Sequence, residues 1–292
     1  MIEKKINIQW FPGHMAKTKR ILSENLKLVD IVIEILDARI PISSKNPDID
    51  KLVLNKPKIV VLNKSDLADM TVSKKWEKYF KEKGQKVIFV DSLKGIGIRE
   101  LNKAITELMK EKNERNKQKG RISYVVKSMV VGVPNVGKSA FINKIAGKKI
   151  AQTGDRPGVT RSKQWVKLND KIDLLDTPGI LWPKFEDMNV GLNLAFTGAI
   201  KDEVYDIIEV SCILLEKLNK LYPDLIEKRY KVIDIKDKKG YEILEEIAKK
   251  RGCIISGGEI DYTRISAIVL DEFRAGKIGK ISLETPDMYV EE

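Results

Sequence analysis

One glycine-containing segment limits the possible folds of this chain more than any other feature. Residues 132–139 have the sequence GVPNVGKS, between an apolar run at 123–131 and a run with helical spacing at 140–145. A glycine-rich loop between a strand and a helix binds phosphates through its backbone N–H groups and the N-terminus of the helix. The segment therefore predicts an α/β domain with a phosphate site at the carboxyl edge of a mostly parallel sheet.

The residues of this loop have expected roles at a nucleotide. The ammonium of Lys138 reaches the β- and γ-phosphates, and the hydroxyl of Ser139 binds Mg²⁺. We expect the other contacts of this loop to come from Asn135, Val136, Gly137 and Ala140. The alternative is a glycine-rich turn with no ligand, which the flanking strand and helix disfavour.

A second motif, DTPG at 176–179, follows a predicted strand at 171–175. There Asp176 can reach the magnesium shell, and the N–H group of Gly179 can meet the γ-phosphate. In the loop before that strand, Thr160 offers a second hydroxyl to Mg²⁺ when a triphosphate is bound. DTPG alone is a weak signal, and Thr160 by itself is equally consistent with an ordinary polar loop.

Base specificity is predicted by the motif NKSD at 63–66, which follows the β-branched run at 58–62. A carboxylate at Asp66 accepts hydrogen bonds from the ring N–H and the exocyclic amine of guanine, whereas adenine offers no matching pair of donors. Asn63 and Lys64 complete the motif. The motif therefore selects GTP and GDP over ATP.

A further loop lies where the base is expected. It contains Ser92 and Leu93 and follows the predicted strand at 87–90. Its backbone N–H groups are expected to reach the guanine oxygen. This loop or NKSD alone could be an ordinary strand-to-helix connection, but both follow strands of a sheet whose carboxyl edge binds ligands.

The order of these motifs along the chain is unusual. The four elements resemble those of GTPases of the translation-factor and Ras type, in which the phosphate loop comes first. Here NKSD and Ser92 precede the phosphate loop, and DTPG comes last. A parallel sheet tolerates this order, because every functional loop projects from the same edge. We therefore predict a circularly permuted P-loop GTPase domain over 1–182 and a small all-helical, RNA-binding domain over 183–292, with the nucleotide state transmitted through 181–188.

With QWFPGHM at 9–15 ahead of the permuted motifs and a helical domain behind them, essentially the whole chain resembles the ribosome biogenesis GTPase A family. The resemblance implies hydrolysis of GTP during late maturation of the large (50S) ribosomal subunit. It also implies a low intrinsic activity that binding to the particle raises.

The resemblance suggests roles for two further residues. Ile180 stands where Ras-type enzymes have a water-orienting glutamine, and the family is thought to use the histidine of FPGHM, here His14, for that purpose. A structural role for this single histidine is the alternative. In related GTPases with an asparagine at the position of Asn135, a potassium ion lies beside the phosphates, where it would neutralise charge on the bridging oxygens.

The charge of the chain fits a polyanionic partner. Lys and Arg number 54 against 42 Asp and Glu, so the formal net charge is +12. RNA, DNA and anionic membranes all satisfy this argument, and solubility alone is the alternative. The resemblance selects the large ribosomal subunit and its rRNA, with no DNA or membrane partner. Candidate phosphate contacts, each of which could instead be part of a solvated face, are Lys228, Arg229, Lys238, Lys239, Lys249, Lys250, Arg251, Arg264, Arg274, Lys277 and Lys280.

We expect a cytoplasmic monomer that binds GTP or GDP, Mg²⁺ and K⁺. The cysteines, Cys212 and Cys253, lack the spacing of metal ligands, no run has the length of a bilayer span, and the first residues lack the apolar stretch of a secretory signal. Three alternatives stay open. They are a nucleotide-gated RNA-binding module in which hydrolysis hardly matters, a GTPase acting on the small subunit or a transfer RNA, and a membrane-surface signalling protein, for which no lipidation motif is found.

Overall fold

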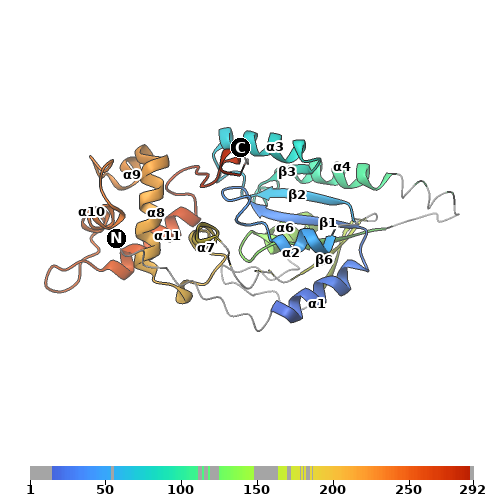
Figure 1. Cartoon of the computed structure of the whole chain (residues 1–292), viewed down its shortest axis with the longest axis horizontal. Helices are drawn as coiled ribbons and strands as arrows, with labels where there is room; N and C mark the ends of the chain where they lie inside the picture. The colour runs from blue at the N-terminus through green and yellow to red at the C-terminus, as the bar shows by residue number, and fades with distance from the viewer. Residues whose placement is uncertain are drawn as a thin grey trace.

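The computed structural model describes residues 15–53, 56–110, 125–147, 164–169, 172–177 and 187–289, with the single residues 114, 118, 179, 181 and 185. An α/β part and an all-helical part lie end to end along the long axis of the molecule (Figure 1). The predicted architecture, a mostly parallel sheet flanked by helices and followed by a helical region, is confirmed.

The sheet contains six strands in the order β3-β2-β1-β4-β6-β5. The parallel strands are β1 (Ile31–Asp37), β2 (Lys58–Asn63), β3 (Lys86–Val90), β4 (Val126–Val131) and β6 (Ile172–Asp176). At one edge, β5 (Gln164–Asn169) pairs antiparallel with β6. The sequence predicted β4 from residue 123, but residues 123 and 124 lie outside the described part of the chain.

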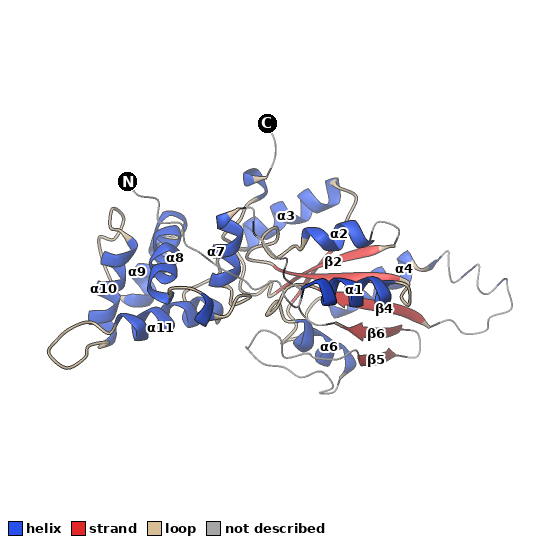
Figure 2. Ribbon diagram, turned by 60° about the horizontal axis from the view of Figure 1, so that its bottom comes forward, coloured by secondary structure: helices blue, strands red, loops and turns tan. Residues whose placement is uncertain are grey.

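Helices cover both faces of the sheet (Figure 2). They are α1 (Met15–Leu26), α2 (Pro47–Val53), α3 (Met70–Glu82), α4 (Ile98–Leu108) and α6 (Lys138–Ala146). Side chains of a strand alternate between faces, so the central strand β1 contributes to two cores. Ile31, Ile33 and Ile35 pack in the core that α4 and α6 cover. Val32 packs in the opposite core with α1 and α2, and Leu36 packs there against α3.

The helical part comprises α7 (Met188–Phe196), α8 (Ile207–Leu221), α9 (Pro223–Tyr230), α10 (Gly240–Arg251) and α11 (Tyr262–Arg274). Asp206 caps α8, where its carboxylate accepts hydrogen bonds from the N–H groups of Ile208 and Glu209. Gly240 lets α10 approach α8 closely, since a Cβ atom there would lie 2.0 Å from the Cys212 carbonyl oxygen. No helix of the described residues is long and apolar enough to cross a membrane.

The segment that follows α11 returns to the α/β part, and in Figure 1 the red end of the ribbon lies beside α3. The N–H group of Ile281 donates to the Leu67 carbonyl oxygen at 2.9 Å. The indole N–H of Trp76 donates to the Glu284 carbonyl oxygen at 3.1 Å. Residues of the predicted helical domain therefore also pack on the α/β part, and the boundary at residue 182 stays a prediction.

Candidate nucleotide site

The loops that follow the parallel strands meet at one edge of the sheet, as the predicted topology requires. Five strands end there, at Asp37, Asn63, Val90, Val131 and Asp176. Because the motifs extend from these strand ends, the order of the strands along the chain does not change where the loops point. NKSD, the Ser92 loop, the phosphate loop and DTPG thus come together despite their permuted order.

Asn63 joins three of these loops. Its Nδ2 atom donates to the Val136 carbonyl oxygen in the phosphate loop at 2.7 Å. Its Oδ1 atom accepts hydrogen bonds from Ser92, from the backbone N–H at 3.2 Å and from the hydroxyl at 2.6 Å. Gly137 is required beside it, because its φ is +95° and a Cβ atom there would lie 2.4 Å from Asn63 Nδ2. The first residue of NKSD therefore fixes the base loops against the phosphate loop.

Lys64 binds a carboxylate that the sequence prediction did not include in the site. Its Nζ atom lies 3.0 Å from Oδ2 of the buried Asp37. The guanidinium of Arg39 binds the same carboxylate at 2.9 Å through Nε and at 2.8 Å through NH2. Although burial opposes ionisation of Asp37, the charges of Arg39 and Lys64 hold the pKa of its carboxyl well below its usual range. The sequence signal for it is that Asp37 directly follows the mostly β-branched run at 31–36.

The carboxylate predicted to bind guanine, that of Asp66, is about one-third exposed and lies 3.9 Å from the Lys94 ammonium. The backbone N–H groups of Leu93 and Lys94, expected to reach the guanine oxygen, each donate to Asp91 Oδ1 at 3.0 Å. Asp91 thus orders the base loop from within. The sequence prediction missed it, and the signal for it is an aspartate that directly follows a strand.

In the phosphate loop, Lys138 is bound by carbonyl groups of its own loop. Its Nζ atom donates to the carbonyl oxygens of Gly132 at 3.1 Å and Val133 at 2.8 Å. Burial lowers the pKa of Lys138 to about 8, and the nearby charge of Asp176 opposes this effect. The lysine expected to meet the phosphates therefore lies in the loop with its charge weakly compensated.

The first and last residues of DTPG lie against the phosphate loop. Asp176 is buried, burial raises its pKa, and within the described part of the chain its Oδ1 atom has no hydrogen-bond partner. A Cβ atom on Gly179 would lie 2.8 Å from the backbone of Pro134 and 3.0 Å from Lys138 Nζ. Only glycine fits there without a shift of the phosphate loop.

These residues fit a bound Mg²⁺. A hard cation takes oxygen ligands and is held at nucleotide sites by few protein side chains together with the phosphates. The buried carboxylate oxygen of Asp176 and the Ser139 hydroxyl in the first turn of α6 provide such ligands. Among the described residues no group of three or more His, Cys, Asp or Glu side chains is placed to hold a metal by itself. Two predicted site residues, His14 and Thr160, lie outside the described residues.

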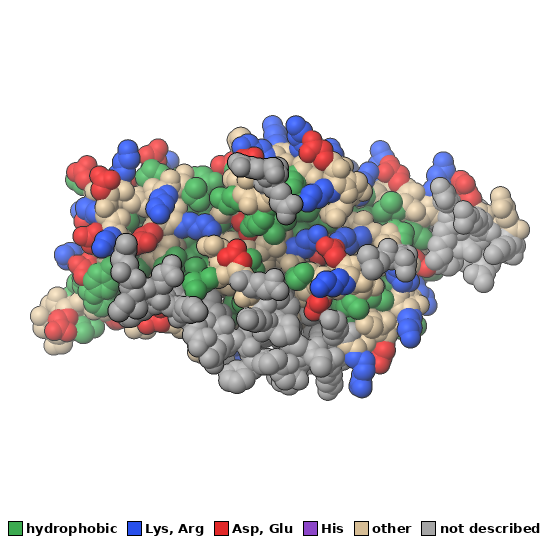
Figure 3. Space-filling view, viewed as in Figure 1, with side chains coloured by type: hydrophobic (Ala, Val, Ile, Leu, Met, Phe, Trp, Pro, Cys, Tyr) green, Lys and Arg blue, Asp and Glu red, His purple; other side chains and the backbone are tan. Residues whose placement is uncertain are grey.

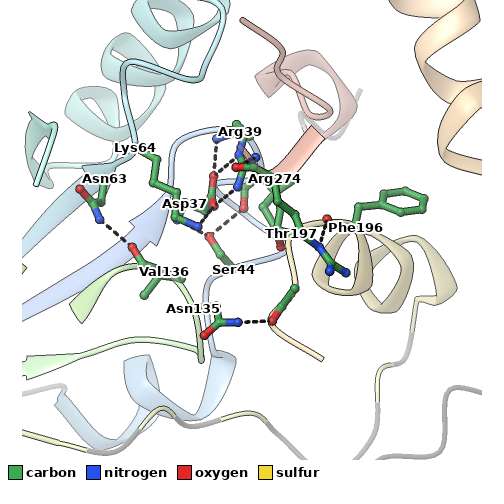
Figure 4. A network of polar contacts seen from close by, with 12 residues as sticks. Asp37, Arg39, Ser44, Asn63, Lys64, Asn135, Val136, Phe196, Thr197 and Arg274 are labelled. Atoms are coloured by element: carbon green, nitrogen blue, oxygen red, sulfur yellow. Dashed lines mark hydrogen bonds and ion pairs between the residues drawn. The ribbon is translucent and has the colours of Figure 1, made fainter. Parts of the chain in front are cut away.

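Asn135 connects the phosphate loop to the helical part (Figure 4). Its Nδ2 atom donates to the Gly198 carbonyl oxygen, just beyond α7, at 2.6 Å. Arg274 of α11 binds the end of the same helix, through the carbonyl oxygens of Ala195 at 3.0 Å and Phe196 at 3.2 Å. The end of α7 is therefore held both by Asn135 of the phosphate loop and by Arg274 of α11.

The predicted RNA contacts divide into two groups. Some form ion pairs within the helical part: Arg229 and Arg251 bind Glu272, Lys238 binds Glu246, and Arg274 binds Asp202. On the face that Figure 3 shows, basic and acidic side chains of this part are interspersed. The other candidates are exposed: Lys228, Lys239, Lys249, Lys250, Arg264, Lys277 and Lys280.

Comparisons with known proteins agree with this geometry. A protein-family profile described as "50S ribosome-binding GTPase" matches residues 127–251, which include the phosphate loop and DTPG, while NKSD lies before the match. Ribosome biogenesis GTPase A of Bacillus cereus is 50% identical over 285 residues, which are 98% of this chain and 96% of that protein. The protein of the same name from Thermotoga maritima is 31% identical and covers 96% of this chain. The crystal structure of GNP-bound YlqF from T. maritima superposes with a TM-score of 0.64 at 27% identity, covering 93% of this chain and 99% of that one.

Proposed function

We infer that this chain, which belongs to the ribosome biogenesis GTPase A family and hydrolyses GTP, assists late assembly of the large (50S) ribosomal subunit and is stimulated by that particle. The observation that carries this proposal is the 50% identity across 98% of the chain to a protein of that name. The description of the matching profile as 50S ribosome-binding and the net charge of +12 support it. The role implies a cytoplasmic protein with rRNA as its partner.

The arrangement of the site supports a separate role in GTP hydrolysis for each of its residues. Asp66 accepts the donors of guanine, and Asn63, tied to Val136 and Ser92, holds the base and phosphate loops in register. With GTP bound, Lys138 would turn from its loop carbonyl groups to the β- and γ-phosphates, and the oxygens of Ser139 and Asp176 would hold Mg²⁺. The metal, when bound, neutralises charge that develops on the phosphate oxygens. Water would then attack the γ-phosphorus in line as its bond to the β–γ bridging oxygen breaks, which gives GDP and inorganic phosphate.

Three further roles complete the proposal. Gly179 presents its N–H group to the γ-phosphate, and Thr160 adds a hydroxyl to the metal in the triphosphate state. His14 orients the attacking water in place of a glutamine, since an imidazole can orient or accept a proton from water near neutral pH. If His14→Ala retained full stimulated turnover, this last role would be excluded.

Asn135 is proposed to bind K⁺ through its carboxamide oxygen, because its Nδ2 atom donates to Gly198. A cation there would stabilise the charge on the bridging oxygens during hydrolysis. Turnover should therefore be faster in potassium than in sodium at equal ionic strength. Equal rates in the two salts would exclude the ion.

The deciding experiment is GTP turnover by the purified chain in potassium buffer, alone and with added large or small ribosomal subunits. We expect strong stimulation by the large subunit only. A role on another RNA, such as the small subunit or a transfer RNA, is the second candidate, and it is supported only by the charge. Equal stimulation by both subunits, or none by either, would contradict a large-subunit role and leave the GTP site intact.

A further inference from the structure

We propose that Asp37 and Arg39 form a polar bridge that holds Lys64 of the guanine site and the C-terminal end of α11 in one network, so that guanine-nucleotide binding and docking of α11 stabilise each other. Both are positioning residues, because neither is expected to touch the nucleotide. The inference rests on the proposed role of NKSD at the base and adds a connection from this motif to the helical part.

The bridge begins at a carboxylate that has no access to solvent. Asp37 is 1% exposed, and its two oxygens bind Arg39 and Lys64. A third contact comes from the backbone N–H of Arg39, which donates to Oδ1 at 3.1 Å. A buried carboxylate is stable only with such partners, so displacing either cation leaves a charge uncompensated.

On the nucleotide side, the bridge fixes the strained part of NKSD. Lys64 has a φ of +57°, in the left-handed region that residues other than glycine rarely adopt. The Lys64 carbonyl oxygen accepts a hydrogen bond from the N–H of Leu67 at 2.9 Å, in the turn that contains Asp66. The ion pair between the Lys64 ammonium and Asp37 therefore helps to hold the Asp66 carboxylate in position to bind guanine.

On the other side, the remaining edge of the Arg39 guanidinium faces α11 (Figure 4). Its NH1 atom donates to the carbonyl oxygens of Phe273 at 3.2 Å and Arg274 at 3.5 Å. Its central carbon lies 5.0 Å from the centre of the Phe273 ring, and the N–H of Leu283 donates to its carbonyl oxygen at 2.9 Å. The last carbonyl groups of a helix carry partial negative charge, which suits a guanidinium.

The contacts with Lys64 on one side and with α11 on the other couple nucleotide binding to the docking of α11. Arg39 is 1% exposed, so in this arrangement its guanidinium contacts protein groups instead of solvent. Ordering of NKSD by a nucleotide strengthens the position of Asp37 and Arg39, and through them that of α11. Thermodynamic linkage requires the reverse as well, so whatever holds α11 in place raises nucleotide affinity by the same factor.

The test uses Arg39→Lys in the full chain, because lysine keeps a charge beside Asp37 but cannot contact Asp37 and the α11 carbonyl groups at once. We expect the Kd for a fluorescent GDP analogue to rise about fivefold or more, within the usual range of coupling between sites. Arg20→Lys is the matched control. It changes an exposed arginine whose ion pair, with Glu24, lies within α1, and should change the Kd less than about twofold.

Hydrogen exchange distinguishes the bridge from a merely structural role of Arg39, because a structural role would not make exchange at the end of α11 depend on GDP. The N–H groups of Ala275, Gly276 and Lys277 form the hydrogen bonds that end α11. GDP should slow their exchange in the wild-type chain, and this effect should disappear in Arg39→Lys. Equal GDP protection in both proteins, or an unchanged Kd in a folded variant, would overturn the bridge.

Two arms keep the outcome decisive. If Arg39→Lys does not fold, the wild-type exchange experiment is the test. The proposal would then be overturned if GDP did not change the exchange of the N–H groups at the end of α11. Asp66→Asn separates the bridge from the base site. If it leaves GDP binding unchanged, the assignment of NKSD fails; if it weakens binding while Arg39→Lys does not, only the bridge fails.

Discussion

The two halves of the nucleotide site differ in how their charged groups are held. On the base side, Asp37 is compensated by Arg39 and Lys64, and Asn63 is bonded to two other loops. On the phosphate side, the hydrogen bonds that the described residues offer the Lys138 ammonium come from backbone carbonyl groups, and Asp176 keeps a buried oxygen with no hydrogen-bond partner among those residues.

The two sides therefore differ in how much they contribute to the stability of the chain. Buried charges with partners hold a fold together, whereas buried charges with weak compensation are costly and mark functional sites. The base side should therefore contribute to folding as well as to recognition. The phosphate side should lower the stability of the chain, because its buried charges are compensated only when phosphates and Mg²⁺ bind.

Lys138→Ala gives the largest expected effect. Loss of the ammonium at the phosphates should lower the rate of GTP turnover by about a thousandfold, as for removal of other charge-stabilising groups at a reacting centre. The melting temperature should stay constant or rise, because burial disfavours this charge. Turnover and thermal unfolding measured beside Lys103→Ala, an exposed lysine of α4, check this. A large loss of stability in Lys138→Ala would mean that the phosphate side also stabilises the fold.

How much of this site the sequence could predict depends on how far apart along the chain the contacting residues lie. The phosphate loop, DTPG and NKSD are local patterns, and parallel strands bring them to one edge whatever their order. The bridge is different, because Arg39 binds carbonyl groups 234 and 235 residues away, which no local spacing encodes. The ion pairs that engage Arg229 and Arg251 depend in the same way on how the helices pack.

Asp37→Asn should produce the next largest effect, on folding. A neutral amide leaves the guanidinium of Arg39 and the ammonium of Lys64 without their shared counter-charge, which we expect to lower the free energy of unfolding by about 3 kcal/mol. Chemical denaturation measures this change, with the exposed Asp237→Asn as the control. Asp176→Asn, on the phosphate side, should cost no stability. Equal losses for Asp37→Asn and Asp176→Asn would remove the contrast between the halves.

Asp66→Asn tests the base side by specificity. The amide cannot accept both donors of guanine, so GTP binding should weaken by about 2 kcal/mol, or roughly thirtyfold. Xanthosine triphosphate, which has a carbonyl group in place of the amine, should bind the variant better than it binds the wild type, because the amide N–H can donate to it. Competition between the two nucleotides measures the exchange. Loss of both affinities together would indicate a structural role for Asp66.

The smallest effect is a pH dependence that belongs to the phosphate side alone. Burial lowers the pKa of Lys138 to about 8, and bound phosphates would raise it by favouring the ammonium. Binding of GTP therefore takes up a proton above pH 8 and takes up none well below it. We expect the Kd for GTP to be constant from about pH 6.5 to 7.5 and to rise toward tenfold per unit above about pH 8, since one pKa unit corresponds to about 1.4 kcal/mol. Guanosine, which has no phosphate, is the control for titration of the base. In Lys138→Ala, the Kd values for GTP and guanosine should depend on pH in the same way. If guanosine showed the same dependence, the titrating group would lie on the base side or on the ligand, and the phosphate side would hold its lysine charged throughout this range.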